Sequence, residues 1–245
     1  MNRWIDCVRA EHAKLKRTFA RGMAIAAPVC AVLLSLFVLA NLDVLAASKG
    51  IARWEAYLDS LLRIWASFVL PIMATLQAVL IAQLEHGNRQ WKYLLALPVS
   101  RASLYVAKSV NLFALLLLGH VVLWLAAMAA CAAFGLAPDA LGAAGGFLAG
   151  RLGGTFVAAL VLAAVQLLVA VRLESFVAAI AVGLVATLVA LLGASTLGHA
   201  AGYYPWSMPM HALQVPQAAW WIGVLAATVV VTALGAQWLR RMQVH

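Results

Sequence analysis

The chain has 245 residues, of which 66% are hydrophobic and only 10% are charged. A soluble domain carries roughly 25% charged residues, so this composition excludes an ordinary soluble globular protein and favours a membrane protein. The 17 Lys and Arg residues outnumber the 8 Asp and Glu residues. Because the basic residues cluster beside apolar stretches, the net charge of +9 indicates an anionic membrane surface and not a nucleic acid.

The first predicted element is an amphipathic helix over residues 1–21. At about 100° per residue, one face is apolar and the opposite face carries cations; the apolar positions are Trp4, Ile5, Val8, Leu15 and Phe19. Such a helix can lie in the membrane interface, and the alternative is a solvated basic tail. A cleavable signal peptide is not expected, because the segment is long and charged and the apolar run that follows has full spanning length.

Residues 22–245 are predicted to form a single transmembrane domain. A helix needs about 20 apolar residues to cross the hydrocarbon core, and six stretches have that character: 22–42, 61–83, 109–134, 147–171, 175–194 and 218–238. A Gly/Pro-rich turn, Phe134–Gly146, separates the third from the fourth. The charged step Val171–Ser175 separates the fourth from the fifth. The predicted fold class is therefore all-α integral membrane, with six transmembrane helices and the N-terminal interfacial helix.

A few polar side chains interrupt the predicted spans, and two interpretations of them stay open. They either form hydrogen bonds between helices or line a sparse polar pathway for an amphipathic substrate. The residues concerned are Gln77, Gln83, Asn111, His120 and Gln166. Pro71 predicts an irregularity in the second span.

The positions of the basic residues predict the orientation. With both termini in the cytoplasm, 13 of the 17 Lys and Arg residues lie on the inner side. The four on the outer side are Lys49, Arg53, Arg63 and Arg151. The outer loop 195–217 and the start of the last span carry Tyr203, Tyr204, Trp206, Trp220 and Trp221, which suit an interfacial aromatic belt around a broken-helix cap.

Several kinds of chemistry lack their sequence patterns. The chain has no G-x-x-x-x-G-K-[ST] phosphate loop, no H-E-x-x-H zinc motif and no G-x-S-x-G nucleophile motif. Acidic residues are missing from the spans, which argues against an ion-coupled transporter, and no filter-like sequence supports a channel. His199 and His211 have no matching third ligand nearby. We therefore expect neither a catalytic site nor a metal site in this chain.

Residues 84–108, between the second and third spans, form a compact block of charged, aromatic and apolar residues. Glu85 and Arg89 are four residues apart, which supports a helix, and Pro98 ends it. Ser100 is placed to cap a new helix. The pattern predicts a short amphipathic cytoplasmic helix held between two spanning helices, and the alternative is an ordinary basic loop.

This block resembles the permease subunits of type-2 ABC exporters, most closely the branch that contains bacitracin- and lantibiotic-immunity permeases. The resemblance is carried by Glu85, then "WKYLLALPVSR" (Trp91–Arg101), then Lys108. The six-span layout, the N-terminal helix and the aromatic segment Tyr203–Pro209 are also similar. The resemblance implies a multi-pass protein of the bacterial cytoplasmic membrane that exports a peptide antibiotic or another amphipathic or lipid-like molecule.

The resemblance also implies the partners and the coupling residues. Two copies of a separate ATP-binding subunit would bind ATP and magnesium, so no cofactor and no enzyme activity are expected in this chain itself. A second permease, either an identical copy or a sister chain, would complete the transporter. The residues expected to contact the ATP-binding subunit are Glu85, His86, Arg89, Trp91, Lys92, Leu94, Leu97, Pro98 and Arg101. The alternatives are a membrane immunity or scaffold protein that binds a toxin or lipid without pumping, and an integral membrane enzyme with a dispersed site.

Overall fold

The computed structural model describes residues 3–16, 18–41, 53–86, 100–193, 198–214 and 216–241, and every regular element in these ranges is helical. The elements in chain order are α1 (Arg3–Leu15), α2 (Ala20–Asn41), α4 (Arg53–Ile64), the π-helical turn η1 (Trp65–Val69), α5 (Leu70–His86), α7 (Arg101–Ala133), α8 (Pro138–Arg172), α9 (Phe176–Leu192), the 3₁₀ turn η2 (Gly198–Tyr203), α10 (Met208–Ala212) and α11 (Ala218–Arg241). The predicted all-α class is confirmed.

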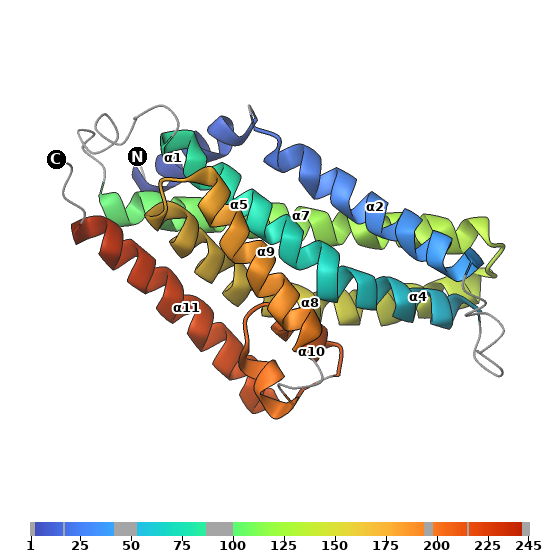
Figure 1. Cartoon of the computed structure of the whole chain (residues 1–245). Coiled ribbons are helices and arrows are strands. Elements are labelled where there is room, and N and C mark those ends of the chain that lie inside the picture. Colours follow the sequence, from blue (N-terminus) through green and yellow to red (C-terminus); the bar gives the residue numbers. More distant parts are fainter. Residues whose placement is uncertain are drawn as a thin grey trace.

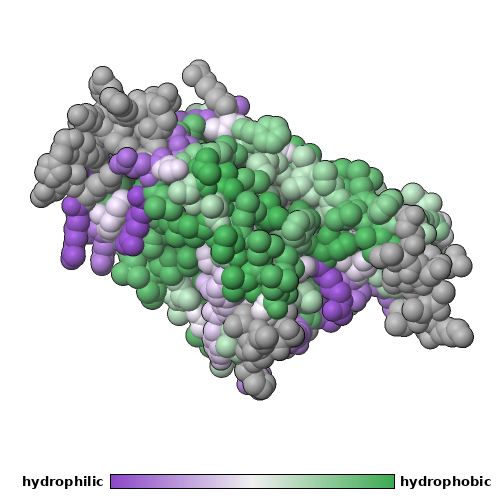
Figure 2. Space-filling model, viewed as in Figure 1, coloured by the Kyte–Doolittle hydropathy of each residue, from purple (hydrophilic) through white to green (hydrophobic). Residues whose placement is uncertain are grey.

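The long helices form one bundle (Figure 1). Helices α7 and α8 pack against each other in its centre. Helix α2 covers α7. Helices α5 and α9 lie on the side of the bundle formed by α8, and α11 crosses both central helices. The surface over the middle of the bundle is broadly hydrophobic (Figure 2), and large apolar side chains of α2, α9 and α11, such as Phe37, Val185 and Val229, are exposed. This is the surface expected of a protein whose solvent is lipid.

Five helical stretches are long and apolar enough to cross a membrane: Ala20–Val38, Trp54–Leu84, Arg101–Ala133, Pro138–Arg172 and Ala218–Arg241. The chain is therefore a multi-pass membrane protein. The predicted span 175–194 coincides with α9, which has 17 residues. At about 1.5 Å per residue it is about 25 Å long, a little short of the ~30 Å hydrocarbon core. The count of six spans stays a prediction.

Several helices extend well beyond the spans predicted from hydropathy. Helix α7 begins at Arg101, where the predicted span begins at 109, and α8 begins at Pro138, where the prediction has 147. Hydropathy marks the part of a helix at hydrocarbon depth, whereas hydrogen bonding continues until a residue ends it. The predicted turn over 134–146 is wrong in extent: only residues 134–137 are non-helical, with Gly135 at φ 75°. Pro138 then begins α8, because its missing N–H is not needed in a first turn.

The irregularity predicted at Pro71 is present one turn before it. The backbone N–H of Leu70 donates to the carbonyl of Trp65, five residues earlier, so α4, η1 and α5 form one continuous helix with a π-helical turn inside it. Pro71 has no N–H to donate to the preceding turn. The wide turn therefore lies where the ordinary hydrogen-bond ladder is interrupted.

Glycine allows the closest approach between α11 and α7. Gly235 lies against the ring of Tyr105, and a Cβ atom at this position would overlap that ring. Tyr105 is fully buried, so its ring has no free space to move into. Gly183 of α9 makes a similar approach to the side chain of Thr75 on α5. Small residues at such crossings let membrane helices pack through van der Waals contact.

We predict that Gly235→Ala destabilises the bundle by about 1–3 kcal/mol, because overpacking forces α7 and α11 apart. The matched control is Gly223→Ala on the same helix, where nothing lies within 4 Å of the added methyl group. That control should be neutral or slightly stabilising, since Ala favours a helix over Gly. Thermal unfolding of the purified protein in detergent measures both, and equal melting temperatures for the two variants would contradict the packing argument.

Candidate functional site

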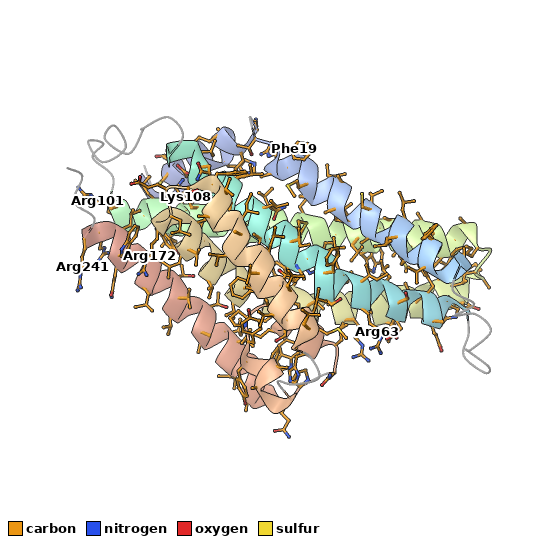
Figure 3. The ribbon with its side chains drawn as sticks, in the orientation of Figure 1. Phe19, Arg63, Arg101, Lys108, Arg172 and Arg241 are labelled. Atoms are coloured by element: carbon orange, nitrogen blue, oxygen red, sulfur yellow. The ribbon has the colours of Figure 1, made fainter. Side chains whose placement is uncertain are left out.

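Basic side chains gather at one end of the bundle, which we call the basic end and define by Arg101, Lys108, Arg172 and Arg241 (Figure 3). The described N- and C-terminal elements, α1 and the last turn of α11, also lie there (Figure 1). The opposite end, near Arg63, is the far end. The basic end contains the ends of the predicted coupling segment 84–108, so we take it as the candidate functional site.

Both flanks of the coupling segment are fixed in helices. Glu85 and His86 form the last turn of α5, and Arg101 is the first residue of α7. The cap predicted at Ser100 is confirmed: its hydroxyl accepts a hydrogen bond from the Ser103 N–H at 3.1 Å. The remaining predicted coupling residues, Arg89, Trp91, Lys92, Leu94, Leu97 and Pro98, lie outside the described residues, so their arrangement stays a prediction.

Helix α1 is anchored on α7 by a buried ion pair. The Nζ atom of Lys108 donates to the Glu11 carboxylate at 2.8 Å, and the two side chains are only 1% and 4% exposed. Lys14 binds the other carboxylate oxygen at 2.5 Å. Burial alone would raise the pKa of the Glu11 carboxyl, but the charge and hydrogen bonds of Lys108 and Lys14 hold that pKa below its ordinary value of 4.5. The carboxylate therefore stays charged and paired at neutral pH.

Further polar contacts surround this pair. The Asn111 amide donates to the carbonyls of Val8 at 3.2 Å and Ala107 at 2.9 Å, and its oxygen lies 3.0 Å from Nδ1 of His12. The face of α1 that packs on α7 thus combines Cys7 and Leu15 with charged and polar groups. Because these contacts come from two distant segments, they fix α1 directly over the first turns of α7.

The packing of α1 on α7 buries part of the apolar face that the sequence predicts for the membrane interface. The helix itself is present, but Trp4 is 45% exposed and Phe19 is 70% exposed, whereas Leu15 is fully buried. The predicted apolar face is therefore divided between contact with α7 and contact with the surroundings. The exposed aromatic residues still suit a membrane interface, and that location stays a prediction.

Two further contacts connect the other helices at the basic end. The Gln83 amide donates to the carbonyl of Glu174, in the short turn between α8 and α9, at 3.3 Å. The Arg172 guanidinium lies 5.4 Å from the ring centre of Trp238 on α11, a cation–π distance. The tight turn predicted around Val171–Ser175 is confirmed, with Ser175 capping α9. At the basic end, α1 is therefore connected to α7, α5 to the turn between α8 and α9, and α8 to α11.

The predicted pathway residues are placed by hydrogen bonds to several different elements. Gln77 donates to Ala20 of α2 at 3.4 Å, and Gln166 donates to Ala179 of α9 at 2.8 Å. His120 is buried against Trp65 and Phe156 and lines a shallow cavity of about 250 Å³. These bonds fit the structural interpretation.

A polar pathway nevertheless stays a prediction. The amide oxygens of Gln77 and Gln166 are buried and have no hydrogen-bond partner among the described residues. An unpaired buried acceptor costs free energy, and it is the kind of group that a passing polar ligand can satisfy.

The aromatic cap predicted between the last two spans is a folded unit. The indole N–H of Trp220 donates to Gly202 at 2.7 Å, and the Tyr204 hydroxyl donates to Ala186 of α9 at 2.9 Å. Elements η2 and α10 lie beside the first turns of α11, and together they line an open cavity of about 730 Å³, with Tyr203, His211 and Trp220 among its lining residues. The cap thus carries an aromatic cavity close to the far end.

The fold and the basic end define a helical multi-pass membrane protein whose N-terminal helix and inter-span segment meet at one end. The chain belongs to the ABC-2 family transporter proteins, since the model of that family matches residues 7–190, about three-quarters of the sequence. No curated protein is significantly similar to the chain. Membership identifies the membrane-spanning permease part of an ABC transporter, which works with an ATP-binding partner subunit.

The sequence reasoning missed Glu11 and His12 as parts of this site. A signal was present: Glu11 falls between the apolar positions Val8 and Leu15 of α1, on the side that would otherwise be purely apolar. An acidic residue in such a stripe requires a buried cation. Lys108 is the basic residue that the structure supplies, from 97 positions away.

We predict that Glu11→Gln weakens the anchoring of α1 by about 3–5 kcal/mol, because Lys108 loses the charge that compensates its buried ammonium group. Trypsin should then cleave the segment before α2 faster, and thermal stability should fall. The double variant Glu11→Gln with Lys108→Met should recover most of the loss. Asp6→Asn, on the exposed side of α1, is the matched control, and equal cleavage rates for Glu11→Gln and this control would refute the role of the ion pair.

The lowered pKa of Glu11 predicts a pH dependence with a definite sign. A depressed carboxyl pKa stabilises the folded state fully above the unfolded value of 4.5, and this contribution is lost as pH falls through the folded-state pKa. Resistance of α1 to an acid-active protease such as pepsin should therefore decline below pH 4.5 in the wild type. Glu11→Gln, which has no proton to gain there, should lack this transition, and an unchanged transition would assign it to another group.

Proposed function

We propose that the chain is the permease subunit of an ABC exporter that moves an amphipathic substrate with ATP hydrolysed by a separate subunit. The observation that carries the proposal is the family match over 7–190, which includes most of α1, both flanks of the segment 84–108 and the core helices. The basic end would face the cytoplasm, because basic residues favour that side of a bilayer. Both termini would then be cytoplasmic, in the inner membrane of a bacterium.

The coupling route starts at the segment between α5 and α7. The ATP-binding subunit would press on residues Glu85–Arg101, and the movement would reach the spans through His86 and Arg101 at the two helix ends. Helix α1 would move with α7, because the Glu11–Lys108 pair joins them. The contact between Gln83 and Glu174 would carry the same movement to α9. Two ATP-binding subunits would act on two permeases, either two copies of this chain or this chain and a sister.

The cargo proposed is a peptide antibiotic, such as a lantibiotic-like peptide, or a lipid-like molecule. This finer assignment rests on the resemblance of "WKYLLALPVSR" to the bacitracin- and lantibiotic-immunity branch. The aromatic cavity of about 730 Å³ beside α10 supports an amphipathic cargo, because cavities of 300–1,000 Å³ with apolar walls and few polar groups suit such molecules. The unpaired amide oxygens of Gln77 and Gln166 would give polar parts of the cargo hydrogen-bond partners.

We predict that Glu85→Ala with Arg89→Ala abolishes export while the complex still assembles. The two contact residues would transmit the ATP-driven movement of the partner subunit, whereas packing of the membrane helices maintains the fold. The measurement is ATP hydrolysis and peptide release by the permease reconstituted with its ATP-binding subunit in vesicles. Arg9→Ala, an exposed cation of α1, is the matched control and should export normally. Normal export by the double variant would refute the coupling role of this segment, and resistance that persists with an inactive ATP site would favour a non-pumping immunity protein.

A further inference from the structure

Two arginines line one small cavity at the far end of the bundle. Arg63 comes from α4 and Arg151 from α8, and the third wall is formed by the residues at the end of α10, including Leu213 and Gln214. The cavity measures about 150 Å³. In the region of α4 a hydrophilic patch interrupts the hydrophobic surface in Figure 2, and Figure 3 places Arg63 there.

The cavity lies about one bilayer thickness from the basic end. Arg151 and Arg172 lie about 21 residues apart on α8, which corresponds to about 30 Å at 1.5 Å per residue. Arg63 precedes Gln83 by about the same number of residues along α4, η1 and α5. Both guanidinium groups therefore lie near the membrane boundary opposite the one where most cations gather, at the depth of lipid headgroups.

The arrangement holds Arg151 in place and leaves much of its donor capacity available. Its Nη1 atom donates to the carbonyl of Leu213, and its guanidinium lies 5.4 Å from the ring centre of Phe147. A guanidinium has five N–H donors, and in the described part of the chain one carbonyl uses a single one of them. Arg151 therefore presents a half-buried, oriented positive charge with donors to spare.

Arg63 forms an ion pair with Asp59 in the same cavity. Its Nε atom donates to Asp59 at 2.7 Å, but the two side chains are 60% and 57% exposed, so this pair is weak and exchangeable. The three charged residues that line the cavity, Arg63, Arg151 and Asp59, leave one net positive charge. The cavity is thus suited to an added anion.

We propose that this cavity is a binding site for a phosphate group at the membrane surface opposite the basic end. The phosphate group would belong either to a lipid headgroup or to free phosphate. The guanidinium group of arginine matches the oxygens of phosphate in geometry and charge. The two guanidinium groups here come from different helices, α4 and α8. A tetrahedral phosphate can direct separate oxygens to Arg63, Arg151 and the Gln214 amide, whereas one arginine already satisfies the two coplanar oxygens of a carboxylate. The volume of about 150 Å³ is large enough for a phosphate group together with some of its bound water.

The site lies outside the coupling route described above and does not rest on it. The α10 wall also lies beyond the residues 7–190 that match the family. Because binding can be measured on the permease alone, without its ATP-binding subunit, failure of this proposal leaves the transport function untouched. Failure of ATP coupling would equally leave this site intact.

The test is calorimetric titration of the full chain in phosphatidylcholine nanodiscs with dihexanoyl phosphatidic acid, inorganic phosphate and acetate. We expect saturable binding of phosphatidic acid, phosphate or both, and none of acetate. Binding of phosphatidic acid alone supports a lipid headgroup as the source, and equal binding of inorganic phosphate supports a free phosphate. Arg63→Ala should weaken binding and Asp59→Asn should strengthen it, each by about fivefold or more, because one unit charge at about 4 Å is gained or lost.

Arg241→Ala is the matched control, since it removes the same charge at the basic end, and it should bind as the wild type does. Arg151→Ala should also weaken binding. If that variant fails to fold because Leu213 loses its donor, the exposed positions Arg63 and Asp59 still decide the question. The proposal is overturned if no phosphate probe binds saturably, if acetate binds as well as phosphate, or if Arg63→Ala and Asp59→Asn leave the affinity unchanged.

Discussion

The hydrocarbon core offers no water to backbone N–H and C=O groups, and this constraint governs the whole molecule. A chain in which 66% of residues are hydrophobic can satisfy those groups only within helices or closed barrels, and the described residues form helices. Since lipid is as apolar as the side chains, close contact between helices depends on van der Waals packing of helix surfaces with complementary shapes. That is why Gly235 and Gly183 lie where rings and methyl groups of neighbouring helices approach most closely.

The same constraint makes the buried Glu11–Lys108 pair informative. Two charges withdrawn from water are costly unless they find each other with good geometry, so the pair permits essentially one placement of α1. An apolar contact would allow α1 to slide along α7, whereas the ion pair and the bonds of Asn111 set its register. A helix with a fixed register can transmit movement. At the basic end, α1 and α7 are therefore joined in a fixed register, beside the segment on which an ATP-binding subunit would act.

The sequence alone predicted the helical class, the positions of most spans, the Ser100 cap and the turn around Arg172, because each depends on local composition. The Ser100 cap placed the start of α7, but the sequence could not place the start of α8, since hydropathy reports depth and not hydrogen bonding. It also missed the Glu11–Lys108 pair and the cavity between Arg63 and Arg151. Both join residues that are distant in the chain, and no local pattern records which helices pack side by side.

The two ends of the bundle use positive charge in opposite ways. In the proposed orientation the basic end faces the cytoplasm, so the cations there would follow the general preference for that side and would report topology more than binding. The same preference would work against Arg63 and Arg151 at the far end, and no comparable general tendency places two guanidinium groups around one cavity. Arg151 is moreover oriented by Leu213 and Phe147. In the proposed orientation this charge opposes the topological preference, and a charge that is also held in a fixed direction is better explained by a ligand than by orientation in the membrane.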